Sequence, residues 1–165
     1  MQNFRVQCAI QTKSAHETHM LGQLLGEHLP AGAVIAASGA LGMGKTVFAQ
    51  GLAQGLGIAG PVVSPTFTYI QEYMGRLPFC HVDAYRLEGW EEEELAQIGL
   101  SDCFLSAKTA YVEWPEFIRP FLPAETIDLH LNAVPQQPEW RQLLFYFDTD
   151  AHNWLTPLLT PYEKV

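Results

Sequence analysis

Residues 39–46, with the sequence GALGMGKT, combine glycines, a lysine and a threonine at a spacing suited to holding several phosphate groups. Glycine has no Cβ atom, so its backbone can adopt positive φ and approach phosphate oxygens closely. The N–H groups of such a loop, and those that open the following helix, point toward an anion. Lys45 would then reach the β and γ oxygens, and the hydroxyl of Thr46 would bind Mg²⁺, a cation that prefers oxygen ligands.

The chain on either side of this loop supplies the strand and the helix that a Walker A loop requires. Residues 33–37 are apolar without polar alternation, as expected for a central strand covered on both faces. Residues 47–56 follow and are compatible with a helix, with Phe48 and Leu52 on one face. The order predicts a P-loop that binds a nucleotide through Gly39, Leu41, Gly42, Met43, Gly44, Lys45 and Thr46.

Three later stretches place oxygen-bearing side chains where they can reach the same nucleotide. Residues 64–68, SPTFT, contain Thr66, and a threonine in this region of P-loop proteins can sense the γ-phosphate. Asp83 follows an apolar strand, the position of a Walker B carboxylate that binds Mg²⁺ through water or orients the attacking water. Glu113 follows the strand predicted over residues 109–112, so two acids compete for these roles, and the sequence does not divide them.

Other candidates have a structural interpretation beside the functional one. Ser14 can cap a helix that runs to about residue 29, with Glu17 completing a capping box, or it can contact nucleotide. Trp114 can belong to the core or shield the phosphates from water, and Arg141 can lie on the surface or reach nucleotide. Residues 81–86, which contain Asp83, add three more candidates, His81, Tyr85 and Arg86, of which His81 can equally be a buried structural histidine.

The remaining pattern is that of a mixed α/β chain. We predict strands over residues 4–10, 68–74, 77–82, 127–131 and 143–147, and helices over residues 90–98 and 152–159. Residues 127–131 alternate apolar and polar side chains, which predicts a half-solvated strand toward an edge of the sheet. Four glutamates at the start of residues 90–98 suit the positive end of a helix dipole or a solvated acidic face.

Length and charge narrow the class of protein. The 165 residues suit one domain over residues 1–165, and the formal charge of −9 comes without a basic cluster. We therefore expect no direct nucleic-acid binding, whereas an acidic surface suits a basic protein partner. No stretch is apolar enough to cross a membrane or to act as a signal peptide, so we expect a cytoplasmic protein. The three cysteines, Cys8, Cys80 and Cys103, have no paired spacing and are expected to be buried thiols.

The ordered series of residues 39–46, 64–68, 81–86 and 112–116 resembles the TsaE (YjeE) family, small bacterial P-loop ATPases needed for the threonylcarbamoyladenosine modification of tRNA. The resemblance extends over about residues 12–147. It implies a P-loop NTPase fold with three α/β/α layers and a mixed, mostly parallel sheet with an antiparallel part. It also implies ATP and Mg²⁺ as cofactors, TsaB and TsaD as partner proteins, and a supporting role rather than transfer of the modification itself.

The same resemblance assigns roles to individual residues. Lys45 would grip the phosphates, Thr46 with Glu113 would hold Mg²⁺, and Asp83 would support water or metal. Thr66 would belong to a switch-like loop.

In this resemblance Trp114 would line the site, and an arginine near the position of Arg141 would contact nucleotide. Two positions depart from the family, because Met43 stands where alanine is usual and Val47 where threonine is frequent. Position 43 contributes mainly backbone, so binding should survive, whereas Val47 removes a hydroxyl near the phosphates. The preference for adenine comes from the resemblance alone.

Two other functions are compatible with a P-loop in a chain of this size. A small-molecule kinase needs an acceptor pocket and arginines for phosphate transfer, and the five arginines are scattered along the chain. A nucleotide-sensing binding module would bind partners in response to ATP without physiological hydrolysis.

Overall fold

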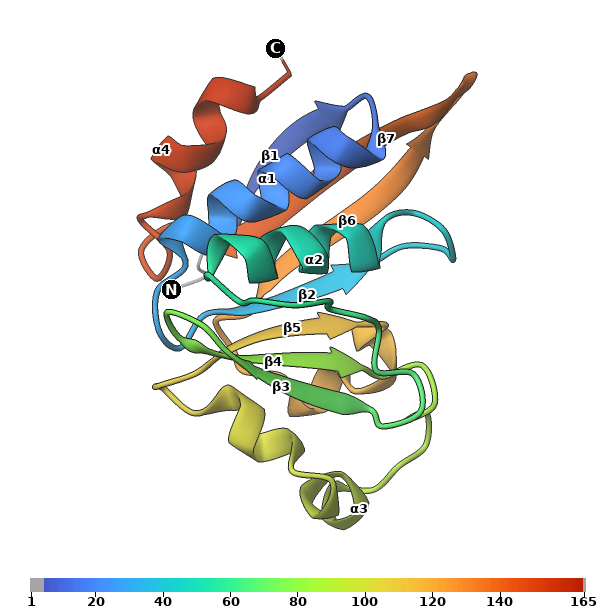
Figure 1. The fold of residues 1–165 in the computed structure, drawn as a ribbon, viewed down its shortest axis with the longest axis vertical. Coiled ribbons are helices and arrows are strands. Elements are labelled where there is room, and N and C mark those ends of the chain that lie inside the picture. The colour runs from blue at the N-terminus through green and yellow to red at the C-terminus, as the bar shows by residue number, and fades with distance from the viewer. Residues whose placement is uncertain (1–4, 165) are drawn as a thin grey trace.

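The computed structural model describes residues 5–164, and its strands form one seven-stranded sheet in the order β1-β7-β6-β2-β5-β4-β3 (Figure 1). The strands are β1 (Arg5–Thr12), β2 (Val34–Ser38), β3 (Ile70–Met74), β4 (Pro78–Asp83), β5 (Thr109–Glu113), β6 (Ile127–Val134) and β7 (Gln137–Asp148). The α-helices are α1 (Ala15–His28), α2 (Lys45–Gly55), α3 (Glu92–Gln97) and α4 (Leu155–Leu159). Short 3₁₀ helices are η1 (Leu100–Phe104), η2 (Pro115–Phe117), η3 (Arg119–Phe121) and η4 (Thr160–Tyr162). Phe4, where the first strand was predicted to begin, lies outside the described residues.

The centre of the sheet is parallel and its flanks are antiparallel. Parallel pairing joins β6 to β2, β2 to β5 and β5 to β4. Antiparallel pairing adds β7 and β1 on one side and the predicted hairpin partner β3 on the other. The carboxyl ends of β2, β5 and β4 therefore meet at one edge, where open α/β sheets bind ligands.

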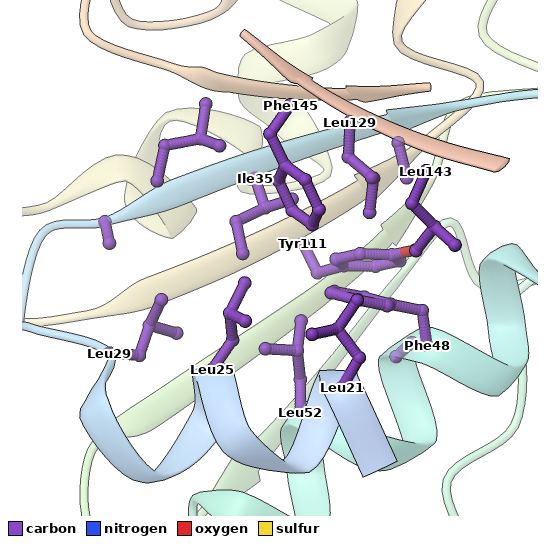
Figure 2. Packing of buried hydrophobic residues seen from close by; sticks show 14 of the residues in the cluster. Leu21, Leu25, Leu29, Ile35, Phe48, Leu52, Tyr111, Leu129, Leu143 and Phe145 are labelled. Atoms are coloured by element: carbon purple, nitrogen blue, oxygen red, sulfur yellow. The ribbon is translucent and has the colours of Figure 1, made fainter. Parts of the chain in front are cut away.

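Helices cover both faces of this sheet, which confirms the predicted three-layer α/β/α arrangement. Successive residues of a strand point to opposite faces of the sheet. In β2, Ile35 packs with buried residues of α1 and α2 on one face, whereas Val34 packs with buried residues of α3 and η1 on the other. In Figure 2, Leu21 and Leu25 from α1, Leu29 directly after α1, and Phe48 and Leu52 from α2 point toward the strands. The strand residues that they face are Ile35, Tyr111, Leu129, Leu143 and Phe145.

Four glycines let α1 and α2 lie close together. A Cβ atom on Gly22 or Gly26 would come closer than 3.0 Å to a main-chain oxygen of α2, and one on Gly51 or Gly55 would do the same to α1. The two helices can approach to this distance only because all four positions lack a side chain. The glycines that weaken the helix propensity of α2 thus set its distance from α1.

The start of α1 differs in one detail from the predicted capping box. Ser14 Oγ accepts a hydrogen bond from the N–H of Glu17 at 3.1 Å, as predicted. The Glu17 carboxylate, however, accepts from the N–H of Lys13 at 2.6 Å rather than from that of Ser14. A complete capping box occurs instead at the start of α3, between Glu91 and Glu94.

The prediction that residues 127–131 lie toward an edge of the sheet is wrong, because β6 lies between β7 and β2. The two polar side chains of residues 127–131 contact other side chains. Asp128 is buried and forms an ion pair with Arg119, and the His130 ring lies 4.9 Å from that of Tyr146. Alternation over residues 127–131 therefore marks polar groups that contact other side chains and does not identify an edge strand.

All three cysteines are free and buried, as predicted. Among the helices of residues 5–164, none has the length and apolar character that a membrane crossing requires.

Candidate nucleotide-binding site

The loop after β2 adopts the conformation that its glycines permit. Gly42 and Gly44 have φ values of 82° and 98°, in the left-handed region that favours glycine. A Cβ atom on Gly39 would lie 2.6 Å from the main-chain oxygen of Leu131. Gly44 is the N-cap of α2 and supplies no side-chain hydrogen bond, so the N–H groups of the first turn remain available to an anion.

A cavity of about 540 Å³ lies beside this loop. It brings together the loop, residues of the 64–66 segment and the ends of β4 and β5. Its lining consists of Leu41, Gly42, Gly44, Lys45, Thr46, Val47, Ser64, Thr66, Asp83, Tyr85, Glu113 and Trp114. Most of the residues predicted from four separate stretches of sequence therefore converge on one site. Met43 is an exception, because its side chain packs against the core.

Lys45 is buried within this site, with 5% of its surface exposed. Its ammonium donates to the main-chain oxygen of Gly39 and, at 3.0 Å, to that of Ala40. It also lies 4.0 Å from the centre of the Trp114 ring. Burial lowers the pKa of Lys45, an effect that the carboxylates of the site, Glu113 first, oppose. A poorly solvated cation of this kind is a strong partner for phosphate oxygens.

Glu113 faces the loop and contacts Thr46. Its Oε1 accepts a hydrogen bond from the Thr46 hydroxyl at 3.1 Å. Its Oε2 lies 2.6 Å from Nε2 of His81, and both side chains are buried. His81 thus stands behind Glu113 and does not line the cavity.

Asp83 contacts a different part of the site, the segment of residues 64–66. Its Oδ2 accepts hydrogen bonds from the hydroxyls of Ser64 at 2.9 Å and Thr66 at 3.3 Å. Its Oδ1 accepts from the main-chain N–H of Tyr85 at 3.0 Å. The two acids are direct neighbours across the β4–β5 pair, yet one holds the loop threonine and the other holds the 64–66 segment.

Aromatic rings form one wall of the cavity. Trp114 adopts a left-handed backbone conformation with φ of 56°. The centre of its ring lies 5.1 Å from the ring centre of Tyr85 and 6.4 Å from that of Phe117. Arg86, also predicted as a candidate, is exposed and lies 4.7 Å from the Phe67 ring outside the lining of the cavity.

A second cavity, of about 250 Å³, lies on the other side of the loop and shares Gly42, Gly44 and Val47 with the first. Ser14 and Arg141 both border it. Thr12 of β1 pairs with Arg141 of β7, and this pairing brings Arg141 close to Ser14, two residues after Thr12. The Arg141 guanidinium donates to the main-chain oxygen of Gly42 at 3.2 Å. A ligand whose phosphates lie beside Lys45 could thus extend toward Ser14 and Arg141.

Two residues of the site were missed in the sequence analysis. Thr18 lines the second cavity, and its spacing of four residues from Ser14 on α1 could have indicated this. The Tyr111 hydroxyl donates to the main-chain oxygen of Lys45 at 2.7 Å, and burial raises the pKa of Tyr111 well above its usual value. Only the three-dimensional packing of β5 against α2 reveals that contact.

The oxygen atoms of the first cavity fit Mg²⁺ held together with a nucleotide. The described residues contain no group of three or more histidines, cysteines or acids that could hold a metal by themselves. Mg²⁺ at phosphate sites usually takes one or two protein oxygens, and phosphate and water supply the rest. Thr46 and Glu113, with Asp83 beside them, provide such a set.

Comparisons with known proteins identify relatives of this chain in sequence and in fold. Residues 12–142 match the family model of the threonylcarbamoyl adenosine biosynthesis protein TsaE. The tRNA threonylcarbamoyladenosine biosynthesis protein TsaE of Synechocystis is 47% identical over 111 residues, which are 66% of this chain and 69% of the relative. The protein of the same name from Bacillus subtilis is 39% identical over 156 residues, 94% of this chain and 95% of the relative. The crystal structure of Bacillus subtilis YdiB superposes with a TM-score of 0.80 at 30% identity and covers 96% of this chain and 97% of that one.

Proposed function

Because the chain belongs to the TsaE family of tRNA threonylcarbamoyladenosine biosynthesis proteins and has a P-loop NTPase fold, we propose that it is the Mg²⁺-dependent ATPase of that pathway. The observation that carries the proposal is the meeting of Lys45, Thr46 and Glu113 in one cavity. Glu113 ends β5, whereas Lys45 and Thr46 follow the loop after its parallel neighbour β2. Thr46 and Glu113 are already in contact.

Five residues of the first cavity have tasks that their present contacts support. Lys45 would exchange the carbonyls of its own loop for phosphate oxygens, which carry full negative charge and attract an ammonium more strongly. Thr46 and Glu113 would hold Mg²⁺, which neutralises charge on the phosphates when it is bound. Asp83 would orient the attacking water, since its carboxylate already binds two hydroxyls beside the cavity. Trp114 would keep bulk water from the phosphates.

The second cavity would take the nucleoside. Ser14 and Arg141 border it, and Ser14 caps α1, which packs closely on α2. ATP is the nucleotide that family membership favours.

We further propose that TsaB and TsaD are the partners, and that ATP turnover supports repeated rounds of tRNA modification in the cytoplasm. The formal charge of −9 argues against direct tRNA binding and suits a partner with basic surface. Leu41 is 87% exposed and Tyr85 54% exposed at the cavity, and a bound partner would cover such side chains.

The kinase alternative finds no support in the position of the arginines whose side chains are described. Arg76 donates to the main-chain oxygens of Gly26 and Leu29, and Arg119 is paired with Asp128. Among these arginines, none lines the larger cavity, where a transferred phosphoryl group would need them.

The test is ATP hydrolysis by the purified chain, alone and with TsaB, TsaD and tRNA. Lys45→Ala should lower kcat/KM about 100-fold or more, because it removes a charge that stabilises the transition state. Lys108→Ala is the matched control, since Lys108 pairs with Glu72 at the opposite end of β5. Circular dichroism should show an intact fold in both variants. Equal hydrolysis by the wild-type chain and by a folded Lys45→Ala variant would refute the site, and absence of turnover in the wild type with all components would refute the activity.

A further inference from the structure

His81 is a fully buried polar residue directly behind the site. It lies on β4 two residues before Asp83, and its side chain is 0% exposed. In the β4–β5 register it faces Tyr111, so Glu113 is its diagonal neighbour on the same face of the sheet. The rings of Phe79 and Tyr111 lie 6.3 Å and 5.7 Å from the imidazole and enclose it.

The hydrogen bonds identify the proton that the imidazole carries. Nε2 lies 2.6 Å from Glu113 Oε2, and an ionised carboxylate can only accept, so Nε2 must be the donor. Nδ1 has no hydrogen-bond partner in the described part of the chain. The neutral imidazole with its proton on Nε2 satisfies this arrangement, because the bare Nδ1 then leaves no buried N–H without an acceptor.

The two oxygens of Glu113 are thereby given separate tasks. His81 holds Oε2, and Oε1 accepts from Thr46 at the edge of the cavity. A carboxylate with one oxygen anchored in the core cannot rotate away from the loop. Loss of the anchor would leave a buried oxygen of Glu113 without its donor and favour another rotamer.

We propose that His81 is a positioning residue that presets the Glu113 carboxylate for Mg²⁺ by donating from Nε2 to Oε2. The proposal rests on the function proposed above, in which Thr46 and Glu113 bind the metal. Outer hydrogen-bond partners of metal ligands act in this way, and their loss typically costs about 10- to 100-fold in metal affinity or activity.

Two substitutions of His81 distinguish positioning of the Glu113 carboxylate from a role in packing the core alone. His81→Gln keeps an amide donor on a side chain of similar reach, whereas His81→Leu fills the space without a donor. Thr109→Val is the matched control, because Thr109 is equally buried and donates to the main-chain oxygen of Pro78 at 3.0 Å, far from the cavity along β5. If His81→Leu does not fold, His81→Asn replaces it as a polar side chain too short to reach Oε2.

The first measurement is binding of Mn²⁺, as a probe for Mg²⁺, to the ADP complex by electron paramagnetic resonance. We expect His81→Leu to weaken Mn²⁺ binding about 10- to 100-fold, with His81→Gln within about fivefold of the wild type. Binding of ADP without metal should change less than about threefold in every variant, because His81 does not touch the nucleotide cavities. The Mg²⁺ concentration for half-maximal hydrolysis should shift in parallel with Mn²⁺ affinity. In the metal-free protein, two-bond ¹H–¹⁵N correlations should show the proton of His81 on Nε2.

The possible failures are distinguishable. Wild-type Mn²⁺ affinity in a folded His81→Leu variant would overturn the positioning role and leave the ATPase untouched, as would an equal loss in His81→Gln or a proton on Nδ1. A wild-type protein that binds ADP but neither binds Mn²⁺ nor hydrolyses ATP would overturn the proposed function and this role with it.

Discussion

Substitution of Gly51 by alanine should destabilise the protein, although helix propensity alone predicts the opposite. Gly51 lies on α2, and an added Cβ would come within 3.0 Å of the main-chain oxygen of His19 on α1, whereas ordinary contact begins at 3.4 Å. The neighbouring backbone N–H of Gln23 would also lie too close. Backbone atoms cannot rotate away as a side chain could, so α1 and α2 must separate.

The magnitude follows from two opposing effects. Alanine gains about 1 kcal/mol over glycine inside a helix. Overpacking of a tight interface costs about 1–3 kcal/mol, and a clash with backbone belongs at the upper end of that range. We therefore expect Gly51→Ala to lower the free energy of unfolding by about 2 kcal/mol.

Urea unfolding followed by circular dichroism measures this change. With a slope of about 2 kcal/mol per molar urea, the midpoint should fall by about 1 M. Gln54→Ala is the control on the exposed face of α2 and should stay within about 0.5 kcal/mol of the wild type. Adding Gly55→Ala to Gly51→Ala should cost less than its single effect, because the first substitution has already separated the helices. A midpoint that rises in Gly51→Ala, or fully additive losses in the pair, would refute the reasoning.

Two further predictions concern the second cavity and the edge strand. Arg141→Ala should weaken ATP binding about tenfold in isothermal titration and leave kcat unchanged. The reason is that Arg141 contacts Gly42 on the side of the loop away from Lys45. A fall in kcat with unchanged ATP binding would contradict this. Burial, with Glu163 beside it, raises the pKa of Cys8 from 9.0 to about 12, so the folded chain keeps a thiol proton that the unfolded chain loses. Stability should therefore decline between about pH 9 and about pH 12, and this decline, measured by urea midpoints, should be shallower in Cys8→Ala; equal slopes would contradict the assignment.

The phosphate loop could be predicted from sequence because its requirements are local. The positive φ of Gly42 and Gly44 and the start of α2 at Lys45 depend on residues adjacent in the chain. The same holds for the acids at the ends of β4 and β5, where an apolar run followed by a carboxylate marks a strand end. These local patterns were sufficient to indicate the family and most of the residues that line the larger cavity.

Features that depend on distant partners could not be predicted in this way. Asp128 gives β6 an alternating pattern typical of an edge strand, but its partner Arg119 comes from a 3₁₀ helix nine residues earlier. The reciprocal half of the capping box at Ser14 was misassigned because Lys13 and Ser14 both offer an N–H close to Glu17. Sequence spacing does not decide between two donors one residue apart.

The division between Asp83 and Glu113 shows most clearly what strand order adds. The two acids occupy the same level in the sheet, so their distance along the strands cannot separate them. The loop follows β2, and β5 is the neighbour of β2 whereas β4 is one strand farther away. Glu113 at the end of β5 therefore reaches Thr46, and Asp83 at the end of β4 meets Ser64 and Thr66 instead. Along the chain the order is β2, β4, β5, but in the sheet β5 lies between β2 and β4. Asp83 is therefore nearer to the loop in sequence than Glu113 is, yet it lies farther from Thr46 in space.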